Sequence, residues 1–345
     1  IITTRQKVPV LKFDNDIELN RDLSIALSEY APDSEVVVDK LKYTSRYIVL
    51  PQDSTLPKYY YYKCTNDKCR RIHVDSVKRE NYMCSNCGSR TIENNFIIPI
   101  LGFISDAKNK DNSMLKPKKT YTSEVNYLGS LEPFSTDVQF NDTLLIQKQS
   151  DDELLIVNEN PFFQCKTCGY SLLDKKSAAL SSYFKEHNTF TGTVCSNDVL
   201  TKITLGHIIT TDVIKMRIKL ALTREEALST LYAMLNGITS YLQIDANDIN
   251  GIVVSDIEDK YSFILYDTTY GGAGNVKQLT DPDELRKMLL RAYDSVNANC
   301  CDENVSCTSC LRNYRNSRSH KYLKRRYARD TLEAILTNKM EFKNL

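Results

Sequence analysis

Short runs in which apolar and polar residues alternate fill the first 160 residues and predict β-strands. The clearest runs are residues 35–38, 41–43, 47–50, 96–104 and 144–157. Asp39-Lys40 separates the first two runs and predicts a hairpin turn, whereas the polar, lysine-rich stretch at 107–120 indicates a surface loop. We therefore expect a β-rich domain over residues 1–160.

The spacing of apolar residues changes from about Leu200 onward and becomes that of alternating strands and helices. The predicted elements are a strand within 204–222, a helix from the capping box Thr223–Glu226 to about Leu242, paired strands at 252–254 and 263–266, a helix capped by Asp281, and a last helix from about Lys321 to Thr337. Gly237 weakens the second half of the first helix. We expect a mixed α+β protein whose residues 161–345 form an α/β domain.

The composition is that of a globular chain with a sizeable core, with 41% hydrophobic and 26% charged residues in 345. The net charge of +1 means that any nucleic-acid partner must be argued from local patches. No apolar stretch approaches the length of a membrane span, and the N-terminus lacks the apolar core of a signal peptide. We expect a cytoplasmic protein without a membrane partner. Because the chain begins with Ile1, we interpret it as trimmed or as a piece of a longer polypeptide.

Eleven cysteines dominate the candidate chemistry. Their number is odd, the chain is large, and most of them lie in close pairs or clusters. In a cytosolic protein this spacing favours metal binding over the disulfide framework of a small secreted domain. Together with one histidine they divide into three sets of four, each suited to one tetrahedral zinc ion. Four protein ligands leave no open position for water, so the sets predict three structural zinc ions rather than a hydrolytic centre.

The first set is typical of a zinc ribbon at residues 64–87 and consists of Cys64, Cys69, Cys84 and Cys87. Two short knuckles provide these ligands, and the glycine after Cys87 suits the turn. His73 lies between the knuckles and is a competing ligand, although the alternation around it favours an ordinary strand residue.

The second set begins with the knuckle Cys165 and Cys168 and is completed by His187 and Cys195. The alternative is a free thiol at Cys195 with an exposed His187, which would leave the knuckle without partners. The third set lies within one short loop and consists of Cys300, Cys301, Cys307 and Cys310. Because its first two cysteines are adjacent, the alternative is that one of them lies beside the metal without binding it.

A basic segment, residues 311–329, follows the third set and is the strongest candidate for nucleic-acid contact. It contains many Arg and Lys residues and three tyrosines but no acidic residue. Cations bind phosphate oxygens, and tyrosine rings stack on unpaired bases. The predicted contact residues are Arg312, Tyr314, Arg315, Arg318, Lys321, Lys324 and Arg325. We expect the last three to share one helix face. The alternative is a solvated face packed against an acidic neighbour. A weaker candidate is Lys68–Arg71 on the ribbon.

The order of motifs in the second half resembles the zinc-binding C-terminal (MZB) domain of MrfA-type superfamily 2 DNA helicases, with relatives in antiphage systems such as DISARM and Druantia. The motifs are Leu205-Gly-His207 with Thr211-Asp212-Val213, then Tyr266–Gly274, then the third cysteine set with Cys310–His320. The segment 29–44 resembles the stretch that follows the motor in these helicases. The chain departs from the family in having Tyr270 where proline is usual and in the adjacency of Cys300 and Cys301. The resemblance implies support of DNA binding and unwinding beside an ATP-driven motor.

The motor itself is absent from the sequence, because no G-x-x-x-x-G-K-[ST] phosphate loop occurs. Gly271–Gly274 lacks the closing Lys-Ser/Thr and more plausibly allows a tight turn. This chain alone is therefore not expected to hydrolyse ATP. Asp212 and Asp267 offer two carboxylates to a nuclease metal, but nothing in their spacing brings them together. Asp267, which ends a strand before glycines, is typical of a turn.

The sequence thus predicts a non-motor, zinc-stabilised, DNA-contacting C-terminal region or accessory subunit of an ATP-dependent superfamily 2 helicase, in antiphage defence or DNA repair. Its expected partners are DNA, either single-stranded or at a duplex junction, and a helicase motor in the same chain or a separate subunit. The alternatives are a zinc-rich scaffold that docks a separate helicase or methyltransferase and, less favoured, a metal-dependent nuclease.

Overall fold

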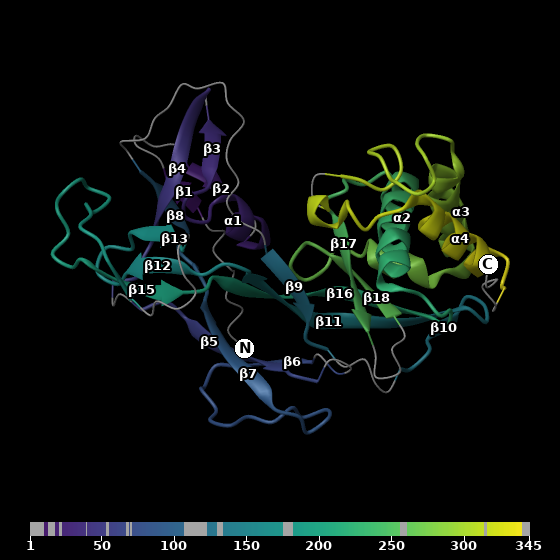
Figure 1. Ribbon diagram of the computed structural model, residues 1–345, viewed down its shortest axis with the longest axis horizontal. Helices are drawn as coiled ribbons and strands as arrows, with labels where there is room; N and C mark the ends of the chain where they lie inside the picture. Colours follow the sequence, from purple (N-terminus) through teal and green to yellow (C-terminus); the bar gives the residue numbers. More distant parts are fainter. Residues whose placement is uncertain are drawn as a thin grey trace. The chain divides into compact units, whose positions relative to one another are not determined.

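The chain packs into two compact units, each assembled from several segments. Unit 1 comprises Ile1–Thr65, Arg71–Asn126 and Leu155–Ile209, and unit 2 comprises Asn66–Arg70, Tyr127–Leu154 and Thr210–Leu345. The computed structural model describes residues 10–12, 18–20, 23–38, 40–52, 55–66, 69, 71–106, 123–129, 134–174, 182–255, 261–313 and 316–339. The predicted mixed α+β fold is confirmed (Figure 1). The predicted division into domains 1–160 and 161–345 stays a prediction.

The described residues of unit 1 form β-sheets and one short helix, α1 (Leu23–Glu29). A five-stranded sheet has the order β2-β1-β8-β4-β3, formed by β1 (Val10–Lys12), β2 (Glu18–Asn20), β3 (Glu35–Val38), β4 (Leu41–Ile48) and β8 (Phe103–Ser105). A three-stranded ribbon has the order β6-β5-β7, formed by β5 (Lys58–Cys64), β6 (Ile72–Asp75) and β7 (Thr91–Ile97). A four-stranded sheet has the order β13-β12-β15-β14, formed by β12 (Phe162–Cys165), β13 (Ser171–Leu173), β14 (Ser182–Phe184) and β15 (Val199–Ile203).

The predicted β3–β4 hairpin is confirmed, but the separate strand predicted at residues 47–50 is wrong. Tyr43, Ser45 and Tyr47 are buried in alternation, so β4 continues without a break to Ile48. The run predicted at 96–104 divides between β7 and β8, because a turn in which the Gly102 N–H bonds the Pro99 carbonyl separates them. The loop predicted at 107–120 lies outside the described residues.

Unit 2 places helices on one face of a β-sheet (Figure 1). The sheet has the order β10-β11-β16-β18-β17, with β9 also paired to β11, and is formed by β9 (Ser123–Tyr127), β10 (Val138–Gln139), β11 (Leu144–Asn158), β16 (Gly206–Ile218), β17 (Ile249–Ser255) and β18 (Tyr261–Asp267). The helices are α2 (Arg224–Leu242), α3 (Pro282–Asn297) and α4 (Arg325–Leu336), with short 3-10 turns η1 (Val276–Thr280) and η2 (Ser317–Ser319). Ile214 and Met216 of the sheet pack with Leu231 and Met234 of α2 in one core. In the described part of the chain, no helix combines the length and apolarity needed to cross a membrane.

Both predicted helix starts before residue 300 are confirmed. Thr223 and Glu226 form the capping box of α2, and the Asp281 carboxylate accepts from two backbone N–H groups of α3. Gly237 does not end α2. A Cβ there would lie 2.5 Å from the Ala292 Cβ, so the glycine allows α3 to approach α2 closely.

The last helix begins four residues later than predicted, at Arg325 rather than Lys321. Residues 317–319 form the turn η2, and Lys324 is the extended residue before the helix. The start is set by the carbonyls of Val305 and Glu303, which accept from the free N–H groups of Arg325 and Arg326. The helix face predicted for Lys321, Lys324 and Arg325 therefore does not form.

Candidate metal centres

Three groups of four potential metal-binding side chains lie in the described residues, with the same members as the three predicted sets. Within each group the ligand atoms all lie within 4.8 Å of one another, and none of the eleven cysteines, all of which belong to the described residues, forms a disulfide. A tetrahedral zinc site with Zn–S bonds of ~2.3 Å places its sulfur atoms about 3.8 Å apart, whereas a disulfide needs about 2.05 Å. The sulfur–sulfur distances described below, 3.5–3.9 Å, fit zinc.

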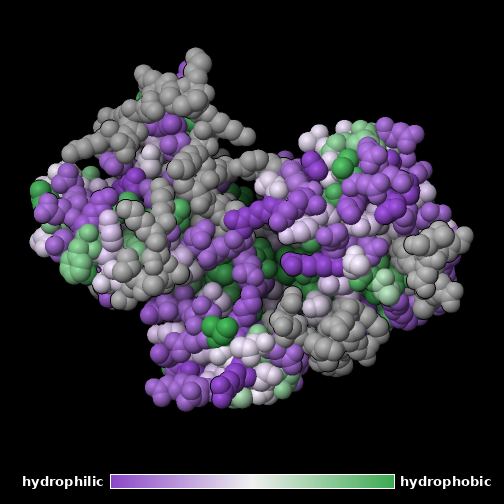
Figure 2. Space-filling model, viewed as in Figure 1, coloured by the Kyte–Doolittle hydropathy of each residue, from purple (hydrophilic) through white to green (hydrophobic). Residues whose placement is uncertain are grey.

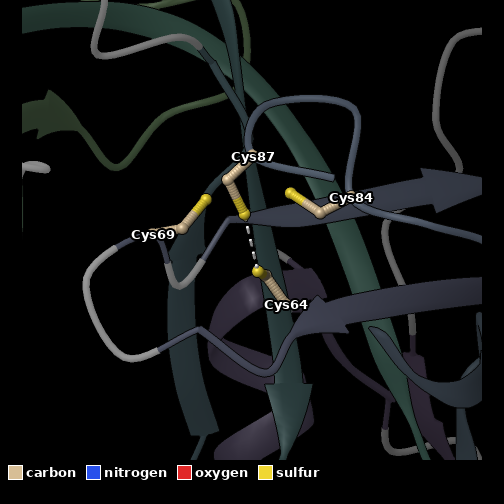
Figure 3. A group of neighbouring side chains, drawn as sticks. All are labelled: Cys64, Cys69, Cys84 and Cys87. Atoms are coloured by element: carbon tan, nitrogen blue, oxygen red, sulfur yellow. Dashed lines mark hydrogen bonds between the residues drawn. The ribbon is translucent and has the colours of Figure 1, made fainter. Parts of the chain in front are cut away.

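The ribbon cluster (Cys64, Cys69, Cys84 and Cys87) lies at the end of the three-stranded sheet. Figure 3 shows the four sulfur atoms pointing to a common centre, with Cys64 Sγ and Cys87 Sγ 3.5 Å apart. Cys64 ends β5, and a turn closed by the Cys69 N–H and the Asn66 carbonyl brings in the second thiol. The Gly88 N–H donates to the Cys84 carbonyl and closes the other knuckle.

His73 is not part of the ribbon cluster. It lies on β6, and its ring stacks on Tyr82 with the centroids 4.9 Å apart. Burial lowers the pKa of its imidazole, which keeps the ring neutral in this aromatic setting. The interpretation of His73 as a strand residue, rather than a competing ligand, agrees with this placement.

In the second cluster (Cys165, Cys168, His187 and Cys195), the hydrogen bonding of His187 fixes which ring nitrogen faces the cysteines. His187 Nε2 lies 3.2 Å from Cys168 Sγ, and Cys165 Sγ lies 3.8 Å from Cys195 Sγ. The other ring nitrogen, Nδ1, lies 2.8 Å from the Lys185 carbonyl oxygen and donates its proton there. That bond leaves the Nε2 lone pair for a metal, as in most protein zinc–histidine sites. Tyr170 stacks on the outer face of the imidazole.

The two knuckle glycines differ in what surrounds them, and this predicts different effects of the same substitution. Both have a positive φ, 69° for Gly88 and 77° for Gly169. A Cβ on Gly169 would lie 2.0 Å from the Ile48 carbonyl oxygen, whereas one on Gly88 would meet nothing within 4 Å. We expect Gly169→Ala to cost ~2–3 kcal/mol of unfolding free energy and to weaken metal binding at the second cluster, whereas Gly88→Ala costs only the ~1 kcal/mol of left-handed strain. Denaturant unfolding of both variants tests this, and equal losses would contradict it.

The third cluster (Cys300, Cys301, Cys307 and Cys310) closes within a single loop after α3. Cys310 Sγ lies 3.9 Å from Cys301 Sγ and 3.8 Å from Cys307 Sγ, and the Cys300 and Cys301 sulfur atoms are 3.9 Å apart. Both adjacent cysteines thus direct their sulfur into the same group. The Cys307 N–H points at Cys310 Sγ at 3.2 Å, a contact that stabilises a thiolate.

Burial raises the pKa of two of these thiols, of Cys310 to about 12 and of Cys168 as well. Hydrogen bonds outweigh burial at their neighbours and lower the pKa of Cys165 and, to about 7, of Cys307. At neutral pH the Cys310 and Cys168 thiols hold their protons until a metal displaces them. A zinc ion in each cluster would supply the positive charge that four converging sulfur or nitrogen donors require.

Asp212 and Asp267 lie close together, contrary to prediction, but neither is available to a catalytic metal. Antiparallel pairing of Val213 with Tyr266 brings the two carboxylates to neighbouring positions on β16 and β18. Asp267 is fully buried and accepts from the N–H groups of Ala273, Asn275 and Val276, while Asp212 pairs with Lys277 at 2.8 Å.

The glycine-rich loop at 271–274 therefore surrounds an internal carboxylate instead of a phosphate. Within the loop, the Ala273 N–H donates to the Asp267 carboxylate, and the Gly271 and Gly272 N–H groups donate to the carbonyls of Thr210 and Thr269. Among the described residues, no carboxylate joins a group of three or more potential metal ligands. The geometry opposes both a phosphate loop and a nuclease centre at this position.

The basic segment combines exposed cations with structural ones. Lys321 is exposed with its Nζ 4.7 Å from the centre of the Tyr322 ring, and Arg318 is exposed on η2. Lys324 Nζ lies 4.7 Å from the Tyr327 ring centre and donates to its hydroxyl oxygen, which raises the pKa of the ammonium. The half-buried Lys324 therefore retains its charge.

The other predicted contact residues have different placements. Arg312 bonds the Ser306 hydroxyl and the His320 carbonyl within unit 2. Arg325 is only 5% exposed and donates to backbone carbonyls, so its predicted exposure to a nucleic acid is wrong. Tyr314 and Arg315 lie outside the described residues, as do Lys68 and Arg70 of the weaker ribbon candidate.

Sequence reasoning did not anticipate how this segment is held against the third cluster. Asn316 donates to the Leu311 carbonyl, and its amide oxygen lies 2.8 Å from His320 Nε2. From α2, Asn236 donates to the carbonyl of Cys310. A folded loop could have been inferred from the polar residues that follow the cysteine knuckle, namely Asn313, Asn316 and His320.

Comparison with known families bears on the third cluster directly. Residues 230–311 match the family model of the MrfA Zn-binding domain. The predicted resemblance is confirmed for this segment, which contains all four cysteines of the third cluster. The ribbon cluster and the second cluster lie outside the part that matches the MrfA Zn-binding domain.

A curated relative extends the similarity over most of the chain. Druantia protein DruE of Escherichia coli (strain UMEA 4076-1) is 25% identical over 365 residues, covering 92% of this chain and 19% of that protein. The chain thus spans about a fifth of the length of this relative. Crystal structures of the DUF1998 helicase MrfA bound to DNA, and to DNA and AMPPNP, align at 12% identity with TM-scores of 0.43 and 0.35, covering 95% of this chain and 34% and 31% of those chains.

Proposed function

We propose that this chain is a non-motor, zinc-stabilised, DNA-contacting C-terminal region or accessory subunit of an ATP-dependent superfamily 2 helicase. The observation that carries the proposal is the third cluster, which lies in the segment matching the MrfA Zn-binding domain and is followed at once by surface cations and tyrosines. The helicase motor would lie in the same polypeptide or in a separate subunit. The relation to a Druantia protein favours antiphage defence, with DNA repair as the other pathway.

In this proposal, zinc binds all three clusters as a structural ion, with the four members of each group as ligands. In each group, four protein ligands would fill all four positions of a tetrahedral zinc ion. With no position open for water, the metals would stabilise the local fold rather than activate water. Three zinc ions per chain are the expected stoichiometry.

The chemistry of the basic segment suits single-stranded DNA or the single strand at a duplex junction. Lys321 and Lys324 each lie beside a tyrosine ring, so a phosphate and an adjacent unstacked base could be bound by the same pair of side chains. Tyr322 is 39% exposed, which leaves part of its ring open to such stacking. Binding of this kind depends strongly on salt, because each phosphate contact releases counterions.

Charge reversal at Lys321 and Lys324 is expected to weaken binding to an oligo(dT) strand by tenfold or more at low salt, because two phosphate contacts become repulsive. The slope of log Kd against log salt should fall by roughly 1–2 units. Fluorescence anisotropy with a labelled strand measures both quantities. The matched control reverses Arg286 and Arg291, two exposed cations on α3, with the same change in net charge. Equal losses in both variants would show that the contact lies elsewhere.

A second candidate function, a scaffold that docks a protein partner such as a separate helicase or methyltransferase, is favoured by the distribution of exposed apolar side chains. Among the described residues, the five most exposed large apolar side chains are Val194 (80%), Phe184 (70%), Val77 (66%), Ile92 (57%) and Phe190 (54%). All five belong to the segments that carry the ribbon and second clusters. Figure 2 shows apolar atoms on the outer surface of the teal loop that Figure 1 draws beside β12 and β15. Absence of DNA binding even at low salt would favour this function over the first.

A further inference from the structure

Arg325 is a buried cation at the junction of two helices. Its Nη1 donates to the carbonyl oxygens of Val296 at 3.0 Å and Ala298 at 2.7 Å, which end α3. No carboxylate of the described residues pairs with it. A guanidinium placed on the last carbonyls of a helix interacts favourably with the negative end of the helix dipole. The last turn of α3 has no basic residue of its own. Arg325, the first residue of α4, provides the positive charge at this position.

The start of α4 is stabilised in return by the loop that carries the third cluster. No side chain caps α4, and its first turn contains no acidic residue. Instead, the Arg325 N–H donates to the Val305 carbonyl and the Arg326 N–H to the Glu303 carbonyl, each at 2.9 Å. Both carbonyls lie in the loop between Cys301 and Cys307. They satisfy backbone donors that a helix N-terminus leaves free.

A third contact joins the same loop to the residue before Lys324. The Ser306 hydroxyl, which is buried, donates to the Leu323 carbonyl at 2.9 Å. The cluster loop is thus bonded to residues 323, 325 and 326, and Arg325 bonds the end of the helix that leads into Cys300. Metal ligands and helix start are two parts of one hydrogen-bonded structure.

We propose that Arg325 is a positioning residue for the third metal cluster, and that metal binding there orders residues 318–326. By bonding the last carbonyls of α3, the guanidinium fixes the orientation of the chain that leads to Cys300 and Cys301. With metal bound, the loop holds the Val305 and Glu303 carbonyls where they accept from the first N–H groups of α4. Where this inference concerns DNA affinity it rests on the proposed function, because residues 318–324 are the proposed contact surface.

The test compares Arg325→Met with Arg326→Met in the full chain. Methionine keeps most of the side-chain volume but donates no hydrogen bond, and Arg326 contacts the Tyr327 ring instead of α3. Graded chelator competition measures release of each equivalent of zinc, and the equivalent lost in Cys301→Ser identifies the third cluster. We expect Arg325→Met to weaken metal affinity at this cluster by 10–100-fold, as for other residues that orient ligands, with the other two equivalents unchanged. Metal affinity equal to that of Arg326→Met would overturn the proposal.

A second measurement does not depend on the folding of a variant. Hydrogen exchange of the Arg325 and Arg326 amides in the wild-type chain is expected to be slow with metal bound. It should be at least tenfold faster after the zinc of the third cluster is removed. Unchanged protection would equally overturn the proposal. If both metal effects are observed but the wild-type chain binds no oligo(dT), the proposed DNA function alone is refuted.

Discussion

Removal of zinc from all three clusters is expected to abolish the cooperative unfolding transition of the chain. Structural zinc contributes on the order of 10 kcal/mol in small zinc modules, comparable to the ~5–15 kcal/mol net stability of a whole domain. The third cluster connects α3 to α4, and the second cluster connects β12 to the segment before β15. Without metal, each becomes a group of converging thiols, with one imidazole in the second cluster, that no covalent bond holds together. Calorimetry before and after a strong chelator, with elemental analysis of bound zinc, measures the effect.

The same chelator saturated with zinc is the control, since it tests for effects unrelated to metal loss. We expect three zinc ions per chain at the start and restoration of the transition when zinc is added back. A metal-free chain that unfolds at the same temperature, or a metal content well below three, would contradict the assignment of these clusters as structural zinc sites.

Asp267→Ala is expected to destabilise unit 2 by about 4 kcal/mol, because three backbone N–H groups lose their buried acceptor at once. The Asp267 oxygens lie 2.8, 3.1 and 3.2 Å from the N atoms of Ala273, Asn275 and Val276, and the side chain is fully buried. Each buried donor left without a partner costs ~1–3 kcal/mol. For a unit of this size the loss corresponds to a fall in Tm of roughly 8–16 °C, measurable by thermal unfolding.

Asp281→Ala is the matched control, because Asp281 also accepts two backbone N–H groups but lies at an exposed helix start. Its loss should cost only the ~1 kcal/mol of an N-cap. If the two substitutions have equal effects, the Asp267 carboxylate does not stabilise the glycine-rich loop as described. Magnesium-dependent DNA cleavage that Asp267→Ala abolishes without unfolding would instead support the nuclease.

The cysteine groups could be predicted from the sequence because ligand spacing carries most of the information. Two cysteines separated by two residues and followed by glycine form a knuckle almost regardless of the surrounding fold. His187 was assignable because the knuckle at Cys165 required partners and few candidates existed. The capping residues Thr223 and Asp281 were equally local, since each cap is formed within the first turn of its own helix.

The features that sequence reasoning missed depend on contacts between distant residues. The true start of α4 depends on carbonyls of the loop at 303–305, which no local pattern around Lys321 reveals. Arg325 was expected at the surface because arginine usually lies there, and its burial depends on the end of α3. The proximity of Asp212 and Asp267 follows from the pairing register of β16 with β18, which spacing along the chain does not contain.

The ligands of each cluster come from one continuous stretch of chain, and this has a consequence for how the protein is made. Cys64 and Cys87 are separated by 23 positions, Cys165 and Cys195 by 30, and the third cluster is confined to one loop. By contrast, β1 must wait for β8 before its parallel pairing of Leu11 with Phe103 can form. Short loops close faster and at lower entropic cost than long ones. If each cluster binds zinc as proposed, a nascent chain can load each ion soon after its segment leaves the ribosome, before the slower sheets assemble.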